Sequence, residues 1–426
     1  MNRPPCGRRA LLVLSAALAV SAARAENWPQ WRGPENSGVS KEKNLPTEWS
    51  ASSNIAWKFD LPGSSGATPA VWGDRIFLTS EDDKDVLLLC VTRSGKELWR
   101  HKYATGSRHY RQDEGNGASP SPSTDGKHVW VFSGTGDLAC FSVDGDEVWH
   151  FNVQDRYGAF KMMWGMHTSP LLYGDRLYLA LLHSGGHHVI ALDKATGKEV
   201  WKVTRDSDAE AECEQSYASP SIGHNGKEAY LVVHGNDYTT AHRLQDGSEI
   251  WRVGGLNPRE HYIRSLRFVA SPVVTSELIV VPSAKKGPVV AVKPDVHGNI
   301  EPGSAQEAWR LPKNTPDVPS PLVYGNFVYL CGESGTLTCL DAKRGKEQYS
   351  KPLHRAKYRA SPVAADGTIY VTSRDGVVTV VKAGPSYEQV AENRLPDQTA
   401  ASPVISNGRI YLRGYSALWA IGKAKE

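Results

Sequence analysis

Histidine, aromatic and arginine side chains gather in several polar segments, each of which ends just before a Ser-Pro or similar pair. Segment 107–118 reads SRHYRQDEGNGA, segment 155–168 reads DRYGAFKMMWGMHT, and segment 354–360 reads HRAKYRA. Aromatic rings can stack on a planar ligand, and arginine can hold a carboxylate through two parallel hydrogen bonds. These residue types predict binding of a planar or anionic ligand, although long surface loops are often polar without any such role.

The candidates for ligand contact are aromatic and basic residues of these segments and of the turns beside them. They are His109, Arg111, Trp164, His167, Tyr217, Tyr262, Arg264, Arg267, Lys285, Arg359 and Arg374. Several belong to a basic arc in the later repeats, whereas acidic residues cluster in 205–214 and 81–85. This segregation would attract an anionic ligand or an acidic partner, and the alternative is that the charges only keep the protein soluble.

No set of residues predicts a catalytic centre or a metal site. Asp237 is the best candidate for a general base, but it is equally a good turn residue. His183 and His187 flank a Ser-Gly-Gly turn and could share a metal ion if they paired across it. Adjacent His187 and His188 point to opposite faces of a strand, and no acidic residue follows at close spacing. We therefore expect neither catalytic residues nor metal ligands.

The Ser-Pro pairs recur along the chain. They are Ser121-Pro122, Ser169-Pro170, Ser219-Pro220, Ser271-Pro272, Ser320-Pro321, Ser361-Pro362 and Ser402-Pro403, with Thr68-Pro69 as a degenerate first copy. Successive prolines are 41 to 53 residues apart, which indicates a repeat architecture. Within a repeat the apolar residues alternate with a period of two, which predicts strands.

One repeat contains four short strands, as in 169–173, 176–182, 188–193 and 199–203, and such a unit is a propeller blade. A turn glycine precedes the fourth strand, and a tryptophan or a residue in its place follows within the strand. These residues are Trp99, Trp149, Trp201, Trp251, Trp309, Tyr349 and Val390. The last repeat has no such strand of its own, and Asn54–Leu61 with Trp57 matches the pattern. We predict an all-β protein, an eight-bladed β-propeller of four-stranded antiparallel blades, closed by this N-terminal outer strand.

The segments ALDKATGKEVW (Ala191–Trp201) and CLDAKRGKEQY (Cys339–Tyr349) resemble the repeat of pyrroloquinoline quinone (PQQ)-like β-propellers. That superfamily includes quinoprotein alcohol dehydrogenases and the propeller lipoprotein of the outer-membrane β-barrel assembly machinery. The resemblance covers roughly Ile55 to Gly422, and residues 27–38 resemble the N-terminus of exported bacterial members. It implies the fold strongly and the function weakly. In residues 27–38, Trp28 and Trp31 are expected to pack as a plug.

The resemblance also implies what a PQQ dehydrogenase would require. The quinone would lie between a tryptophan and, in many members, a disulfide of adjacent cysteines, with calcium and a carboxylate base. This chain has no adjacent cysteines, although Trp164 could stack and Arg267 or Arg359 could hold a carboxylate. We expect a non-catalytic platform that presents the face carrying these polar loops to a protein, peptide or glycan. The alternatives are a PQQ- and calcium-dependent dehydrogenase, and a protein that binds another small anion or a sugar.

The N-terminus predicts export to the periplasm or the cell exterior. Arginines precede the apolar stretch Ala10–Ala19, which is too short to span a bilayer, and Ala23-Arg24-Ala25 fits a cleavage site. Arg8-Arg9 suits a basic leader or a twin-arginine signal, and no lipobox cysteine follows. Cleavage would remove four arginines and no acidic residue, changing the formal net charge from +3 to −1, which does not suggest nucleic acid. The expected division is a signal peptide (1–25), an N-terminal extension (26–53), the propeller (54–422) and a tail (423–426).

Five cysteines would remain after cleavage. Cys90, Cys140 and Cys339 fall at third-strand places where other copies have alanine, which predicts packing between blades. Cys331 is expected to be similar. Cys213 lies in an acidic loop and is expected to be an exposed thiol.

Overall fold

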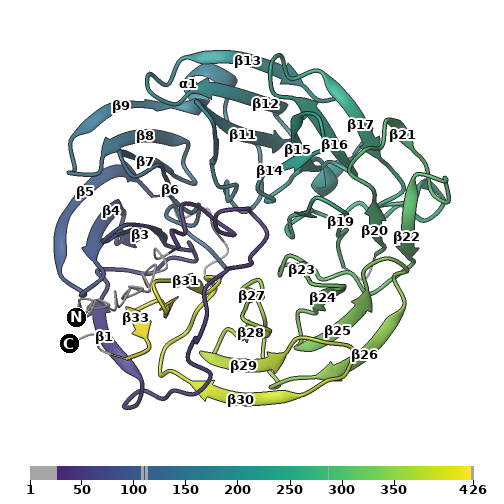
Figure 1. Ribbon diagram of the computed structural model, residues 1–426. Coiled ribbons are helices and arrows are strands. Elements are labelled where there is room, and N and C mark those ends of the chain that lie inside the picture. Colours follow the sequence, from purple (N-terminus) through teal and green to yellow (C-terminus); the bar gives the residue numbers. More distant parts are fainter. Residues whose placement is uncertain (1–25, 107–109, 111–113, 286, 424–426) are drawn as a thin grey trace, which may run out of the picture.

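The computed structural model describes residues 26–106, 110, 114–285 and 287–423. Within these ranges the strands form eight sheets arranged in a ring, so the prediction of an eight-bladed β-propeller is confirmed (Figure 1). The predicted signal peptide and residues 424–426 of the predicted tail lie outside the described residues. No helix in the described part of the chain is long and apolar enough to cross a membrane.

In each blade the strands follow one another from the central channel to the rim (Figure 1). Blades one to three are β2 (Ala70–Trp72), β3 (Arg75–Asp82), β4 (Asp85–Thr92), β5 (Glu97–Thr105); β6 (Ser123–Thr124), β7 (His128–Phe132), β8 (Asp137–Ser142), β9 (Glu147–Asn152); and β10 (Leu171–Tyr173), β11 (Arg176–His183), β12 (Gly186–Asp193), β13 (Glu199–Thr204). Blades four and five are β14 (Ser221–His224), β15 (Ala229–Gly235), β16 (Tyr238–Arg243), β17 (Glu249–Val253); and β18 (Val273–Val274), β19 (Ile279–Val281), β20 (Val289–Val292), β22 (Glu307–Leu311).

Blades six to eight complete the ring. They are β23 (Leu322–Tyr324), β24 (Phe327–Cys331), β25 (Thr336–Asp341), β26 (Glu347–Pro352); β27 (Val363–Ala365), β28 (Thr368–Thr372), β29 (Val377–Lys382), β30 (Gln389–Arg394); and β31 (Val404–Ser406), β32 (Arg409–Arg413), β33 (Ala417–Ile421) with β1 (Ile55–Asp60). The helical turns lie in loops between blades, and they are α1 (Val153–Tyr157), η1 (Ala211–Glu214) and η2 (Arg259–His261). β1 pairs antiparallel with β33, which confirms the predicted closure.

The outer-strand tryptophans join neighbouring blades. The indole Nε1 of Trp57 donates to Arg93 O (2.7 Å), that of Trp99 to Val143 O (3.1 Å), and Trp149, Trp201 and Trp309 make the same contact one blade further on. Trp251 is different, because its Nε1 is buried without an acceptor. In that interface blade five carries an inserted strand, β21 (Gly298–Ile300), which pairs in parallel with β17.

The repeated Ser-Pro pairs form a closed ring of hydrogen bonds around the channel. The backbone N–H of each Ser or Thr donates to the side-chain oxygen of its counterpart in the next blade, from Thr68 N to Ser121 Oγ (2.9 Å) round to Ser402 N and Thr68 Oγ1 (3.2 Å). These residues are buried, so each hydroxyl supplies an acceptor that water cannot replace. The innermost strands therefore begin after the proline, as β10 does at Leu171, and not at the serine.

Replacing Ser219 by alanine should lower the free energy of unfolding by about 1–3 kcal/mol, because the N–H of Ser169 (2.9 Å from Ser219 Oγ) would lose its acceptor. Ser219→Thr should stay within about 1 kcal/mol, since Thr68 already fills this place in the first blade. Urea unfolding of the purified protein measures both. Equal loss in the two variants would mean that packing, and not the hydroxyl, matters there.

The core is divided among the interfaces between adjacent blades, as expected for a repeat protein. Phe77 and Leu88 of blade one, for example, pack with Val129 and Val131 of blade two. Cys90, Cys140, Cys331 and Cys339 are buried in such clusters, which confirms the packing prediction. The prediction for Cys213 is wrong: its side chain is 0% exposed, because it packs with Ala209, Leu266 and Ala284 beneath two loops.

The segment 27–40 crosses one end of the channel, as the purple trace at the centre of Figure 1 shows. Trp28 is buried and exchanges backbone hydrogen bonds with Val71 of β2. Arg32, 2% exposed, donates to Pro321 O (2.7 Å), Pro362 O (2.8 Å) and Ser37 O (2.8 Å). The segment is thus a packed plug that ties innermost strands together, as the sequence predicts.

Candidate functional site

A cavity of about 560 Å³ lies at the centre of the opposite face, where the loops leading into the innermost strands meet. We call these the lead-in loops and this face the loop face. Every blade contributes the residue two positions before its Ser or Thr of the hydrogen-bonded ring: Gly66, Ser119, His167, Tyr217, Val269, Val318, Arg359 and Ala400. The volume is in the range of small-ligand sites, about 300–1,000 Å³.

One side of the cavity is aromatic. His167 lies between Tyr110 and Tyr217, with ring centroids 6.1 and 5.6 Å away and both contacts edge-on. Its Nε2 donates to Trp164 O (2.9 Å), and burial lowers the pKa of the imidazole, so the ring is neutral at pH 7. Trp164 and Tyr217 also line the cavity. This side can therefore hold a flat or apolar part of a ligand.

The other side is charged, and its arginines are already paired within the protein. Arg359 makes a bidentate contact with Glu114 (2.5 and 2.8 Å) and lies 2.7 Å from Glu333. Arg374 lies 3.5 Å from Glu114. Arg267 pairs with Glu212 at 3.1 Å. Glu114 belongs to the lead-in loop of blade two and Arg359 to that of blade seven, so this ion pair connects distant parts of the ring.

Two lysines of the cavity have no carboxylate within 4.0 Å among the described residues. Lys285 Nζ donates only to the backbone O of Ser265 (2.5 Å), and Lys357 is exposed without a carboxylate within 4.0 Å. Asp317 Oδ1 is enclosed by protein; burial raises the pKa of this carboxyl, and the charges of Arg267 and Lys285 partly offset that effect. The cavity thus offers two ammonium groups to a ligand.

The structure brings together six of the predicted site residues in this cavity: Trp164, His167, Tyr217, Arg267, Lys285 and Arg359. Arg374 contacts Glu114 beside it. Tyr262 and Arg264 lie outside it, and His109 and Arg111 fall outside the described residues. The candidate set lacked Glu114, Asp317, Glu333 and Lys357. Asp317 could have been predicted as a site residue, because it lies just before the Ser320-Pro321 pair. Nothing in the sequence marks Glu333.

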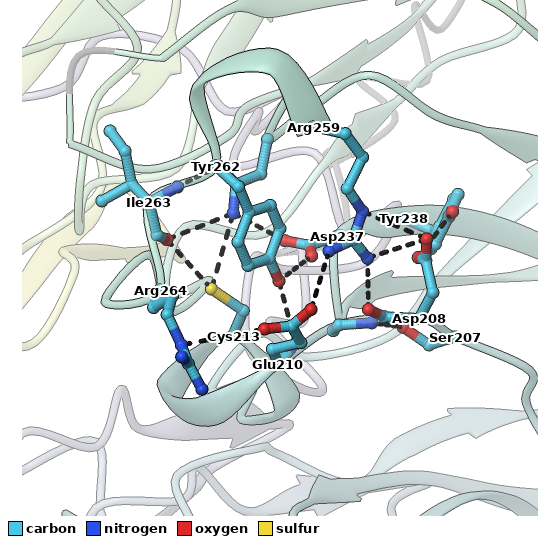
Figure 2. A network of polar contacts seen from close by, with 12 residues as sticks. Ser207, Asp208, Glu210, Cys213, Asp237, Tyr238, Arg259, Tyr262, Ile263 and Arg264 are labelled. Atoms are coloured by element: carbon cyan, nitrogen blue, oxygen red, sulfur yellow. Dashed lines mark hydrogen bonds and ion pairs between the residues drawn. The ribbon is translucent and has the colours of Figure 1, made fainter.

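Tyr262 and Arg264 belong to a separate network between blades four and five (Figure 2). The hydroxyl of Tyr262 donates to Asp237 Oδ2 (2.5 Å), and Arg259 pairs with Asp208 at 2.7 Å and stacks on the Tyr262 ring. Arg264 lies 3.7 Å from Glu210. The acidic loop 205–214 is therefore folded onto the basic loop 255–270. The predicted segregation of charge is wrong at these two blades.

Asp237, the best candidate base, has a structural place in this network. It is 4% exposed, accepts from Tyr262 and from Asn257 Nδ2 (3.3 Å), and occupies a left-handed turn position (φ 62°). Burial raises its pKa to about 6. His183 Nδ1 likewise accepts from the backbone N–H of Gly185 (3.0 Å). Within the described ranges no group of three His, Cys, Asp or Glu side chains could hold a metal ion.

Comparison with known proteins agrees with the β-propeller fold. The family described as outer membrane protein assembly factor BamB matches residues 83–301 and 295–384, more than half of the 426-residue chain. The chain belongs to this PQQ-like β-propeller family. Comparison with the curated proteins finds no match.

Several solved structures show the same fold at low identity. BamB from Moraxella catarrhalis is 14% identical, with 86% of this chain and 96% of that chain covered and a TM-score of 0.60. A europium-containing methanol dehydrogenase is 11% identical (92% and 90% covered, TM-score 0.68). Quinohemoprotein alcohol dehydrogenase from Comamonas testosteroni is 12% identical (94% and 81% covered, TM-score 0.70). At these identities the likeness concerns the fold alone.

The quinoprotein resemblance implies PQQ and calcium, and the residues present do not fit that pair. Trp164 and the arginines could contact a quinone. However, the described cysteines are all free and none lines the cavity, and the described acidic and histidine side chains supply no metal-ligand set. We derive no catalytic step through PQQ.

Proposed function

We propose that this protein is an exported, non-catalytic binding platform that holds an anionic group of a protein, peptide or small ligand in the loop-face cavity. The observation that carries the proposal is the pair of lysines, Lys285 and Lys357, which face a cavity formed by all eight lead-in loops and have no carboxylate partner among the described residues. A carboxylate of the ligand would take that place. The aromatic side would hold the rest of the ligand.

The buried ion pairs around Arg359 would act as scaffold. Glu114 and Glu333 already occupy its guanidinium, so a ligand that used Arg359 would first have to displace a carboxylate. A displaced carboxylate left without a partner in this setting is costly. The lysines require no such exchange, which is why we assign ligand contact to them. The BamB-like fold and the predicted leader support a platform role outside the cytoplasm.

The double variant Lys285→Glu/Lys357→Glu should weaken binding of an anionic probe by about tenfold or more, because two attractive charges become repulsive. The probe is the dipeptide tyrosyl-aspartate, which carries two carboxylates and one ring, and isothermal titration measures its affinity. Arg264→Glu is the control for a charge reversal elsewhere, since this exposed arginine lies on the same face but outside the cavity, and each single lysine variant is compared with it. It should change the affinity less than twofold, about 0.4 kcal/mol.

Equal weakening in the control would mean that overall charge, and not this cavity, attracts the probe. The enzyme alternative has its own measurement. Wild-type protein is incubated with PQQ and Ca²⁺ while quinone absorbance and dye-linked alcohol oxidation are followed. Turnover would overturn the non-catalytic proposal.

A further inference from the structure

Blade five has the shortest second and third strands of the ring. β19 and β20 have 3 and 4 residues, whereas β24 and β25 of blade six have 5 and 6. A groove of about 850 Å³ lies beside blade six, between the lead-in loops of blades six and seven. Leu330 on its wall packs with Val280 of blade five, and Thr338 lies directly opposite Leu330 on β25. The groove therefore lies on the side of blade six that faces blade five.

This groove adjoins the central cavity. Both are lined by Lys285, Asp317, Glu333 and Lys357. At its other end the groove reaches Ser350 on the outer strand β26. Together the two depressions extend from the channel mouth toward the rim, which suits an extended chain.

The wall of the groove carries hydroxyl and amide groups. Asn314, Ser334, Thr336 and Ser350 are exposed within it, and Thr338 is half-buried. Such groups both donate and accept hydrogen bonds, which matches the alternating N–H and C=O groups of a peptide backbone.

The charges of the groove favour an acidic occupant. Arg355 and Lys357 are exposed and have no carboxylate within 4.0 Å in the described part of the chain, and Lys285 contacts only a carbonyl. Of the two carboxylates, Glu333 is paired with Arg359 (2.7 Å), which leaves Asp317 against three cationic side chains. Opposite charge on a partner would be attracted along the whole length of the groove.

We propose that this groove binds an extended acidic peptide segment of a partner protein, whose end enters the central cavity. The inference rests on the proposed function, since the two sites share four residues. A peptide fits better than an anionic glycan, because the groove offers no aromatic ring for stacking a sugar, whereas its hydroxyl and amide groups match a peptide backbone.

The test is a pair of oppositely charged variants at one exposed position on the wall, Thr336→Glu and Thr336→Lys. The probe is a fluorescein-labelled peptide of about eight residues composed of Asp, Glu, Gly and Ser, followed by fluorescence anisotropy. Thr336→Glu should weaken binding of the peptide about threefold or more, and Thr336→Lys should leave peptide binding unchanged or make it tighter. Tyrosyl-aspartate should bind both variants as it binds the wild type, because it occupies the cavity alone.

Other outcomes separate the two proposals. Equal effects of the two variants, or unchanged peptide binding in Thr336→Glu, would overturn the groove proposal. So would tighter binding of an oligogalacturonate of equal charge than of the peptide. If tyrosyl-aspartate binds and the long peptide gains nothing over it, the groove fails while the cavity stands. If neither probe binds, both proposals fail.

Discussion

Replacing Arg32 by alanine should lower the free energy of unfolding by about 3–5 kcal/mol, one of the largest effects expected of any single substitution in this chain. The guanidinium is 2% exposed and donates to three backbone carbonyls, two of which follow the ring serines of blades six and seven. Burial lowers its pKa to about 9, so it is still the charged, donating form at pH 7. Its removal leaves buried acceptors unsatisfied and frees the plug.

Urea unfolding of the mature protein, followed by tryptophan fluorescence, measures the effect. The free energy of unfolding of Arg32→Lys should lie between those of the wild type and of Arg32→Ala, because one ammonium cannot reach all three carbonyls in their present places. Arg100→Ala is the control: this surface arginine pairs with Glu97 on its own strand, and its loss should cost less than about 0.5 kcal/mol. A loss of under about 1 kcal/mol in Arg32→Ala would show that the plug is held by other contacts.

Lowering the pH from 7 to 4 should destabilise the protein by several kcal/mol through three buried histidines. Burial lowers the pKa of His183 to about 4, of His234 to about 3 and of His242 to about 4. The unfolded chain binds these protons near pH 6.5, so the stabilisation is complete above that pH and is lost as pH falls toward 4. Each histidine contributes about 3 kcal/mol, and Asp237 offsets part of this sum, because its raised pKa lets the folded state take up that proton before the unfolded chain does.

His242 provides the cleanest test, because both ring nitrogens are engaged in the neutral form. Nδ1 donates to Gly247 O (2.9 Å) and Nε2 accepts from Thr240 Oγ1 (2.8 Å). His242→Gln should lose stability at pH 7 but show a shallower loss between pH 6.5 and 4.5, by about one proton, or 1.4 kcal/mol per pH unit. His224→Gln, at an exposed histidine, is the control for the slope. Identical slopes in wild type and His242→Gln would contradict the assignment.

Much of the site was predictable once the repeat was aligned. The Ser-Pro register places one residue per blade two positions before each serine, and all eight of these residues line the cavity. His167, Tyr217 and Arg359 could therefore be named in advance. Lys357 lies in segment 354–360 and in the basic arc, so the sequence already marked it. Glu333 could not be named, because it comes from a turn whose reach depends on how neighbouring blades stand beside it. Lys285 was named, but only the structure shows that it has no carboxylate partner among the described residues.

The fold of this protein follows from features of its sequence alone. Eight stacked blades and their closure by β1 are specified by the period of 41 to 53 residues, the alternation of apolar residues and the outer-strand tryptophans. These are local or periodic features, and every copy repeats the same contact with its neighbour. The tertiary structure decided which charges remain available. Arg359 meets a glutamate 245 residues away and Arg264 meets Glu210, whereas Lys357 meets no carboxylate among the described residues. Ion pairs form between loops of neighbouring blades or of blades far apart in the sequence, so no local pattern records them.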